Sequence, residues 1–133
     1  MKIIIGYGRI DRVRFLAYSN IAFLLLGAIA AIVSTVFTEL LESTVVSVFV
    51  VLGIVFTFKF AAQRYHDVGS SGLWALWYIS PTQPVIFLVL GMVPGMKADN
   101  EYGSPNPEAG VWLKIFAFFP LIAVAIWIGE SYL

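Results

Sequence analysis

The chain has 133 residues, of which 60% are hydrophobic and 12% are charged, whereas charged residues make up about 25% of an ordinary soluble domain. Eight Lys and Arg balance eight Asp and Glu, and cysteine is absent. So few charges cannot cover the surface of a small soluble domain. A neutral chain also lacks the basic surface that nucleic-acid binding needs. Composition therefore predicts an integral membrane protein without disulfides or cysteine-based sites.

Four long apolar stretches predict an all-α, polytopic membrane protein with four transmembrane helices, since a spanning helix needs about 20 apolar residues. We expect the spans of this single membrane domain at residues 15–37, 43–62, 73–93 and 111–129. The first follows a basic flank, as a signal peptide would, but it is much longer than the roughly 7–15 apolar residues of a signal peptide. We therefore expect it to be retained as a helix.

The third stretch contains Pro81 and Pro84 and has two interpretations. A helix over its 21 residues would extend about 31 Å, enough to cross an apolar core of about 30 Å, so we expect a proline-kinked span. The alternative is a re-entrant segment that returns to the side from which it came. Re-entry would place all eight Lys and Arg on one side, whereas four spans divide them six to two. Both arrangements place the N-terminus in the cytoplasm.

Three polar blocks lie outside these stretches, at residues 8–12 (GRIDR), 64–72 (RYHDVGSSG) and 100–107 (NEYGSPNP). In this order and spacing they resemble the domain-of-unknown-function family 805, a family of small bacterial inner-membrane proteins. The resemblance runs from Gly8 to Pro107 and leaves Val111 onward outside. It implies a location in the bacterial inner membrane, and it implies no reaction, because the family brings no established activity.

The second and third blocks supply the candidate functional or structural polar motif: Arg64, His66, Asp67, Gly69, Ser71, Gly72, Asn100, Tyr102, Gly103 and Pro107. Only re-entry would bring the two blocks to one face. Histidine is a residue type suited to acid–base chemistry, and a carboxylate could orient the ring of His66, but adjacent helical residues point about 100° apart. We therefore expect structural roles: Arg64 pairs with Asp67, Asp67 caps the next helix, and Gly69 and Gly72 make the turn.

One histidine and no cysteine predict no zinc site and no cofactor. A hard-cation site from Asp67, Asp99, Asn100 and Glu101 is disfavoured because four spans would place its carboxylates on opposite sides of the membrane. The basic residues before the first span are expected to set the topology and to contact anionic lipids, each contributing about 1 kcal/mol near an anionic surface. They are Arg9, Arg12 and Arg14. The expected partners are the lipid bilayer and a second copy of the chain or another membrane protein.

The predicted function class is a non-enzymatic membrane protein. Our first hypothesis is a small transport or permeation component built around the broken third stretch, because transporters use broken helices for binding sites. The alternative is a lipid- or partner-binding interaction module that uses the basic N-terminus and the polar loops. A membrane-embedded enzyme using His66 and Asp67 is the weakest hypothesis, since ionisable groups at a membrane boundary need a cavity to act.

Overall fold

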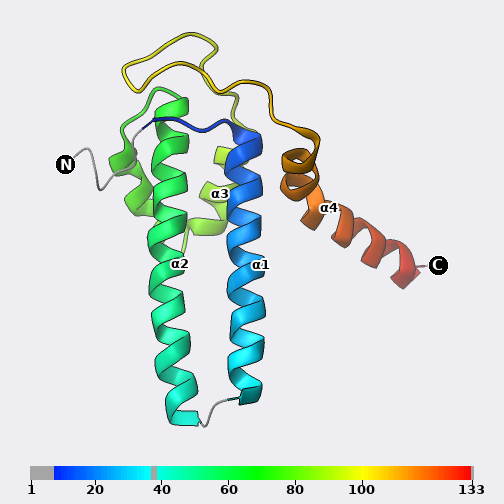
Figure 1. Ribbon diagram of the computed structural model, residues 1–133. Coiled ribbons are helices and arrows are strands. Elements are labelled where there is room, and N and C mark those ends of the chain that lie inside the picture. The colour runs from blue at the N-terminus through cyan, green and yellow to red at the C-terminus, as the bar shows by residue number, and fades with distance from the viewer. Residues whose placement is uncertain (1–7, 37–38, 133) are drawn as a thin grey trace.

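The structure is a computed structural model that describes residues 8–36 and 39–132. Two long helices run side by side in opposite directions as a hairpin, α1 (Arg12–Val36) and α2 (Glu39–Asp67) (Figure 1). The chain continues through a 3₁₀ helix, a short α-helix and a third long helix: η1 (Gly72–Ile79), α3 (Gln83–Met92) and α4 (Val111–Tyr132).

Three of these helices, α1, α2 and α4, are long and apolar enough to cross a membrane. The described residues thus confirm an all-helical chain with long apolar helices, and these helices indicate a multi-pass membrane protein. Residue 37, the last of the first predicted span, lies outside the described residues. The third predicted span is divided between η1 and α3, of which α3 has only 10 residues.

The break between η1 and α3 explains this difference. Pro84 stands in the first turn of α3, where a missing N–H costs nothing, so it starts a helix and does not kink one. The turn before it is closed by the Gln83 N–H, which donates to the Ser80 carbonyl at 3.0 Å. The chain then reverses, since the Met96 N–H donates to the Asp67 carbonyl at the end of α2 at 2.9 Å. The prediction of one proline-kinked helix over 73–93 is therefore corrected.

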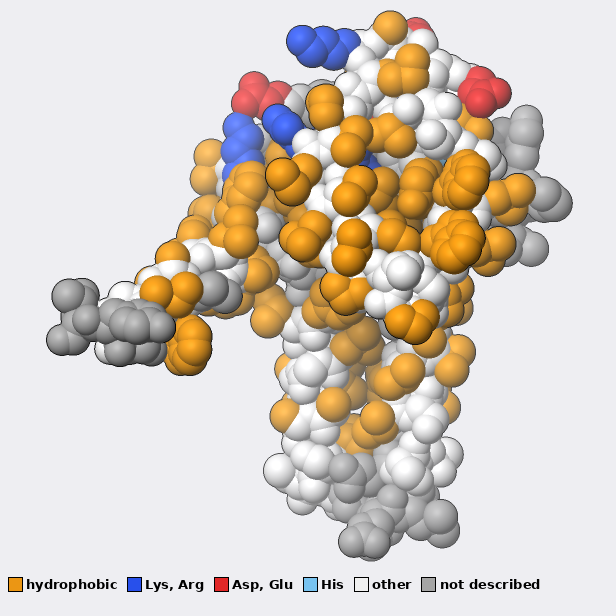
Figure 2. Space-filling model, turned by 180° about the vertical axis from the view of Figure 1, so that it is seen from behind, with side chains coloured by type: hydrophobic (Ala, Val, Ile, Leu, Met, Phe, Trp, Pro, Cys, Tyr) orange, Lys and Arg blue, Asp and Glu red, His pale blue; other side chains and the backbone are white. Residues whose placement is uncertain are grey.

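Both ends of the third stretch consequently lie at one end of the molecule, which we call the polar end. It comprises residues 8–12, 63–72 and 94–110. Charged side chains gather there in Figure 2, whereas hydrophobic side chains cover most of the remaining surface on that face. This distribution is the one expected of a protein whose helices are surrounded by lipid.

The buried core lies just below the polar end, where η1 and α3 pack on the α1–α2 hairpin. Phe15 at its centre is 0% exposed and contacts the rings of Tyr78 and Phe87 at centroid distances of 6.3 and 5.5 Å. Small residues allow the close approach of α2 and η1: Ala61, Ala62 and Ala75 are all fully buried. Farther from the polar end, α1 and α2 expose large side chains such as Ile32 and Val51.

Helix α4 packs on α1 and leans away from it toward its C-terminal end (Figure 1). The link is Asn20 of α1, whose Nδ2 donates to the carbonyls of Phe116 and Ala117 at 3.0 Å each. Pro120 has no N–H to donate to the Phe116 carbonyl, four residues earlier. Asn20 therefore supplies a donor where the proline removes one.

Candidate functional site

Asp67, the last residue of α2, lies between two arginines at the polar end. Its Oδ1 accepts a hydrogen bond from Arg9 Nε at 2.7 Å, and its Oδ2 accepts one from Arg64 Nη1. The side chains of Arg9, Arg64 and Asp67 are only 2%, 0% and 4% exposed. The Arg64–Asp67 pair was expected from its spacing and is confirmed, whereas nothing in the sequence spacing indicated Arg9, 58 positions away. We call these three residues the Arg9–Asp67–Arg64 cluster.

The Arg9 guanidinium also binds the loop that follows α3. Its Nη1 donates to the carbonyls of Ala98 at 2.9 Å and Gly103 at 3.3 Å, and its Nη2 donates to the Met96 carbonyl. The expectation that Arg9 contacts lipid therefore does not fit its position. A buried guanidinium needs partners for its donors, and this loop supplies them.

The Arg64 guanidinium holds the end of the returning helix. Its Nε donates to the Leu90 carbonyl at 2.9 Å, and its Nη2 donates to the Val93 carbonyl. The last carbonyls of a helix lack intrahelical partners and carry partial negative charge, so a cation there satisfies and stabilises them. Arg64 thus caps α3 while it pairs with Asp67.

The carboxylate of Asp67 fits only because residue 95 is a glycine. A Cβ at Gly95 would lie 1.9 Å from Asp67 Oδ2, far inside van der Waals contact. Sequence reasoning did not select this residue, although the Pro94-Gly95 pair was a visible turn signal. Gly95 therefore allows the loop after α3 to approach the end of α2 closely.

His66, the neighbour of Asp67 in the chain, has partners outside the Arg9–Asp67–Arg64 cluster. Its Nδ1 lies 3.0 Å from the Gly8 carbonyl, which can only accept, so Nδ1 carries the proton. The imidazole ring stacks on Tyr102 with centroids 3.8 Å apart and planes 5° apart. Desolvation, and secondarily Glu101, raises the pKa of Tyr102, so that ring remains a neutral phenol at pH 7.

The loop of residues 100–107 folds onto the end of α2 and the start of α1. Asn100 Nδ2 donates to the His66 carbonyl at 2.8 Å, and Asn100 pairs with Gly103, which has a φ of +123°. Asn106 Oδ1 accepts from the Asp11 N–H at 2.9 Å. The Pro107 carbonyl accepts from Arg14 Nη1 at 2.8 Å. The candidate residues of the second and third blocks therefore do meet, as the re-entrant alternative required.

The turn after α2 differs in detail from the prediction. Gly69 has a φ of +78°, which favours glycine, so its expected turn role is confirmed. The helix cap is Ser71, whose hydroxyl accepts from the Leu73 N–H at 3.3 Å, and not Asp67. Gly72 is the first residue of η1 and is not among the described residues with positive φ.

The other two arginines before the first predicted span, Arg12 and Arg14, lie at the surface of the polar end. Arg14 pairs with Asp11 and is partly buried, whereas Arg12 is exposed. In the described parts of the chain, no three His, Asp or Glu side chains lie close enough to hold a metal ion. The cluster has its donors directed at Asp67 and backbone carbonyls, so its arrangement suits holding chain segments together and not binding an anion.

Comparison with known proteins identifies the family. A family model described as "Protein of unknown function (DUF805)" matches residues 6–104. No curated protein and no solved structure matches the chain significantly. The matched region holds the Arg9–Asp67–Arg64 cluster, Gly95 and the His66–Tyr102 stack, and it ends before α4. The chain therefore belongs to the DUF805 family.

Proposed function

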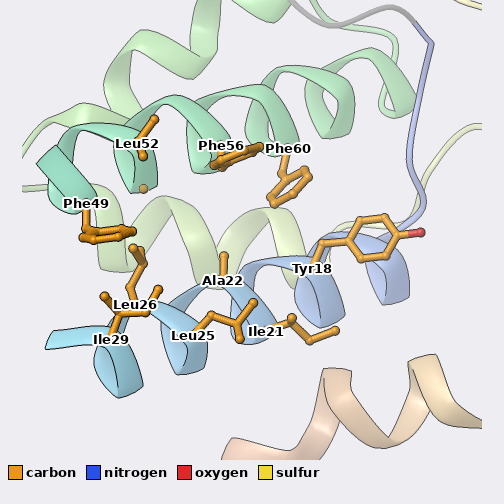
Figure 3. A pocket seen from close by; sticks show the side chains of 11 residues that line it. Tyr18, Ile21, Ala22, Leu25, Leu26, Ile29, Phe49, Leu52, Phe56 and Phe60 are labelled. Atoms are coloured by element: carbon orange, nitrogen blue, oxygen red, sulfur yellow. The ribbon is translucent and has the colours of Figure 1, made fainter. Parts of the chain in front are cut away.

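We propose that this protein is a non-enzymatic membrane module that holds the apolar chain of a lipid in a groove between α1 and α2. This corresponds to the interaction-module hypothesis, narrowed to lipid. The observation that carries the proposal is the groove itself, which has a volume of about 360 Å³ and an almost entirely apolar lining. Figure 3 shows Phe49, Phe56 and Phe60 on the side of α2 that faces α1, and Ala22 and Leu26 directed toward α2. The lining residues are Tyr18, Ile21, Ala22, Leu25, Leu26 and Ile29 of α1 and Phe49, Leu52, Gly53, Phe56 and Phe60 of α2.

The dimensions of the groove favour a thin occupant. Its α1 wall extends from Tyr18 to Ile29, about 16 Å at 1.5 Å per residue. The whole empty space of the groove, its open side included, is about 830 Å³, which over that length gives a cross-section of roughly 50 Å². A helix about 10 Å wide needs a cross-section of roughly 80 Å². A single hydrocarbon chain fits such a space, and a partner helix does not.

The groove and the polar end give less support to the transport and enzyme hypotheses. A transport component needs a polar path, and the groove lining contains one polar side chain, Tyr18, whose hydroxyl points away from the other lining residues (Figure 3). An enzyme needs a free acid or base facing a cavity. Asp67 is held by two arginines, and His66 is stacked on Tyr102 and bonded to Gly8.

The proposed membrane placement has three crossings, by α1, α2 and α4, with η1 and α3 as a re-entrant hairpin. The contacts between the ends of α2 and α3 support this placement, because they put residues 64–72 and 94–107 on one side. All seven Lys and Arg that the structure describes then lie at the polar end or in the helix turns next to it. Cytoplasmic segments are rich in these residues, so we place the polar end in the bacterial cytoplasm.

A photocrosslinking experiment tests the groove. The purified protein is placed in nanodiscs with a phospholipid that carries a photoreactive diazirine in its acyl chain, and the crosslinked residues are mapped by mass spectrometry. Ala22→Phe should reduce crosslinks to the groove lining strongly, because the phenyl ring occupies the space of the acyl chain. Ala28→Phe on the exposed face of α1 is the matched control. Equal crosslinking in the two variants, with unchanged thermal stability, would contradict the proposal.

A further inference from the structure

Lys59 is the unexplained charge of the membrane-spanning hairpin. It lies within the Ser43–Asp67 span of α2 and is exposed. A lysine on the lipid-facing surface of a spanning helix is unfavourable unless its ammonium group reaches the membrane interface or binds a counter-ion. Among the described residues, no side chain forms an ion pair with Lys59. A counter-ion for Lys59 at the edge of the apolar region therefore comes from outside the described residues.

The position of Lys59 relative to the groove follows from helix periodicity. Leu52 and Phe56 line the groove and are 44% and 53% exposed, so they form its open edge on α2. Lys59 follows Leu52 by seven residues and Phe56 by three, and such residues share one face of a helix. Lys59 therefore lies on the same open edge, about one turn nearer the polar end.

A second polar group marks the same end of the groove. The rings of Tyr18 and Phe60 pack at a centroid distance of 5.6 Å across the two helices. The Tyr18 hydroxyl points from this contact toward the polar end (Figure 3). The groove thus combines an apolar length with a phenol donor and an ammonium at the end nearer the polar end, and no acidic side chain is among its lining residues.

We propose that the occupant of the groove is an anionic phospholipid, with one acyl chain between α1 and α2 and its phosphate on Lys59 and Tyr18. This inference rests on the proposed function and adds the class of headgroup. The phosphate supplies the counter-ion that Lys59 needs, and the hydroxyl donor strengthens its binding. A headgroup that also carries a cation would meet Lys59 with no lining acid to compensate, so phosphatidylglycerol should bind better than phosphatidylcholine.

Competition in nanodiscs tests this inference. The photoreactive phosphatidylglycerol and phosphatidylcholine share the same acyl chains, and crosslinks to the groove are compared for each. The parent protein should prefer phosphatidylglycerol about fivefold, the equivalent of about 1 kcal/mol. Lys59→Gln should abolish this preference while crosslinks to the groove persist, and Lys97→Gln, at an exposed loop position, should retain it.

The outcomes separate the two proposals. An unchanged preference in Lys59→Gln, or no preference in the parent protein, would overturn the headgroup assignment and leave acyl-chain binding intact. Loss of preference in both lysine variants would also overturn it, since the effect would then follow net charge and not this site. Insensitivity of all crosslinks to Ala22→Phe would instead overturn the groove as the binding site.

Discussion

Arg9 Nε and Asp67 Oδ1 lie 2.7 Å apart although their residues are 58 positions apart in sequence, and both side chains are at most 4% exposed. The contact joins the segment before α1 to the end of α2. Because Arg9 also binds three carbonyls of the loop after α3, one side chain connects three separate parts of the chain. The return of the third stretch to the polar end is thus stabilised from the N-terminal side.

Asp67→Ala should destabilise the protein by about 3–5 kcal/mol, because it leaves two buried guanidinium groups without their carboxylate. The free energy of unfolding in mixed detergent micelles measures this loss. Glu108→Ala is the control, since it removes the exposed Lys114–Glu108 pair and should leave the free energy of unfolding nearly unchanged. Equal stabilities of the two variants would show that the cluster does not hold the fold.

Gly95→Ala should be destabilising because its Cβ would lie 1.9 Å from Asp67 Oδ2. The expected cost is about 1–3 kcal/mol, typical of forced overpacking. The same substitution should cost less in an Asp67→Ala background, so a double-mutant cycle isolates the clash. Gly110→Ala is a matched control, because a Cβ there meets nothing within 4 Å. Strict additivity of the two substitutions would contradict the assigned clash.

Asn20→Ala should weaken the attachment of α4 to α1, since Asn20 donates to the Phe116 and Ala117 carbonyls. We expect a loss of about 1–3 kcal/mol in unfolding free energy from the unsatisfied carbonyls. In a Pro120→Ala background the new N–H can donate to Phe116, so Asn20→Ala should then cost less. If its cost is the same in both backgrounds, Asn20 does not compensate for the proline.

Cysteine labelling tests the membrane placement, because the natural chain has no cysteine. Asn106→Cys should be protected from an impermeant thiol reagent in intact bacterial cells, whereas Glu130→Cys near the end of α4 should react. In the placement with three crossings, α4 crosses the membrane between these two positions and puts them on opposite sides. Labelling of Asn106→Cys with protection of Glu130→Cys would instead support four spans and place the loop of residues 100–107 outside.

The amino-acid sequence by itself determined the class of protein and the family. Long uncharged stretches can only be accommodated in lipid, so α1, α2 and α4 were predictable from apolar length alone. The Arg64–Asp67 pair and the turn at Gly69 were predictable because their partners are local in the chain. The family resemblance, based on three short blocks, is confirmed by the match over residues 6–104.

Only the tertiary structure decided the path of the third stretch and the composition of the site. The length of the stretch favoured a crossing, since a helix of 21 residues is long enough to span the membrane. Length alone does not reveal that Pro84 begins a new helix after a turn. The return is held by contacts between distant residues, such as Arg64 with Leu90 and Arg9 with Gly103. Helix periodicity carries no information about such contacts, because they depend on where separate helices are placed. For the same reason, the sequence did not distinguish Arg9 from the arginines at the surface. It also did not indicate that Gly95 leaves room for the Asp67 carboxylate.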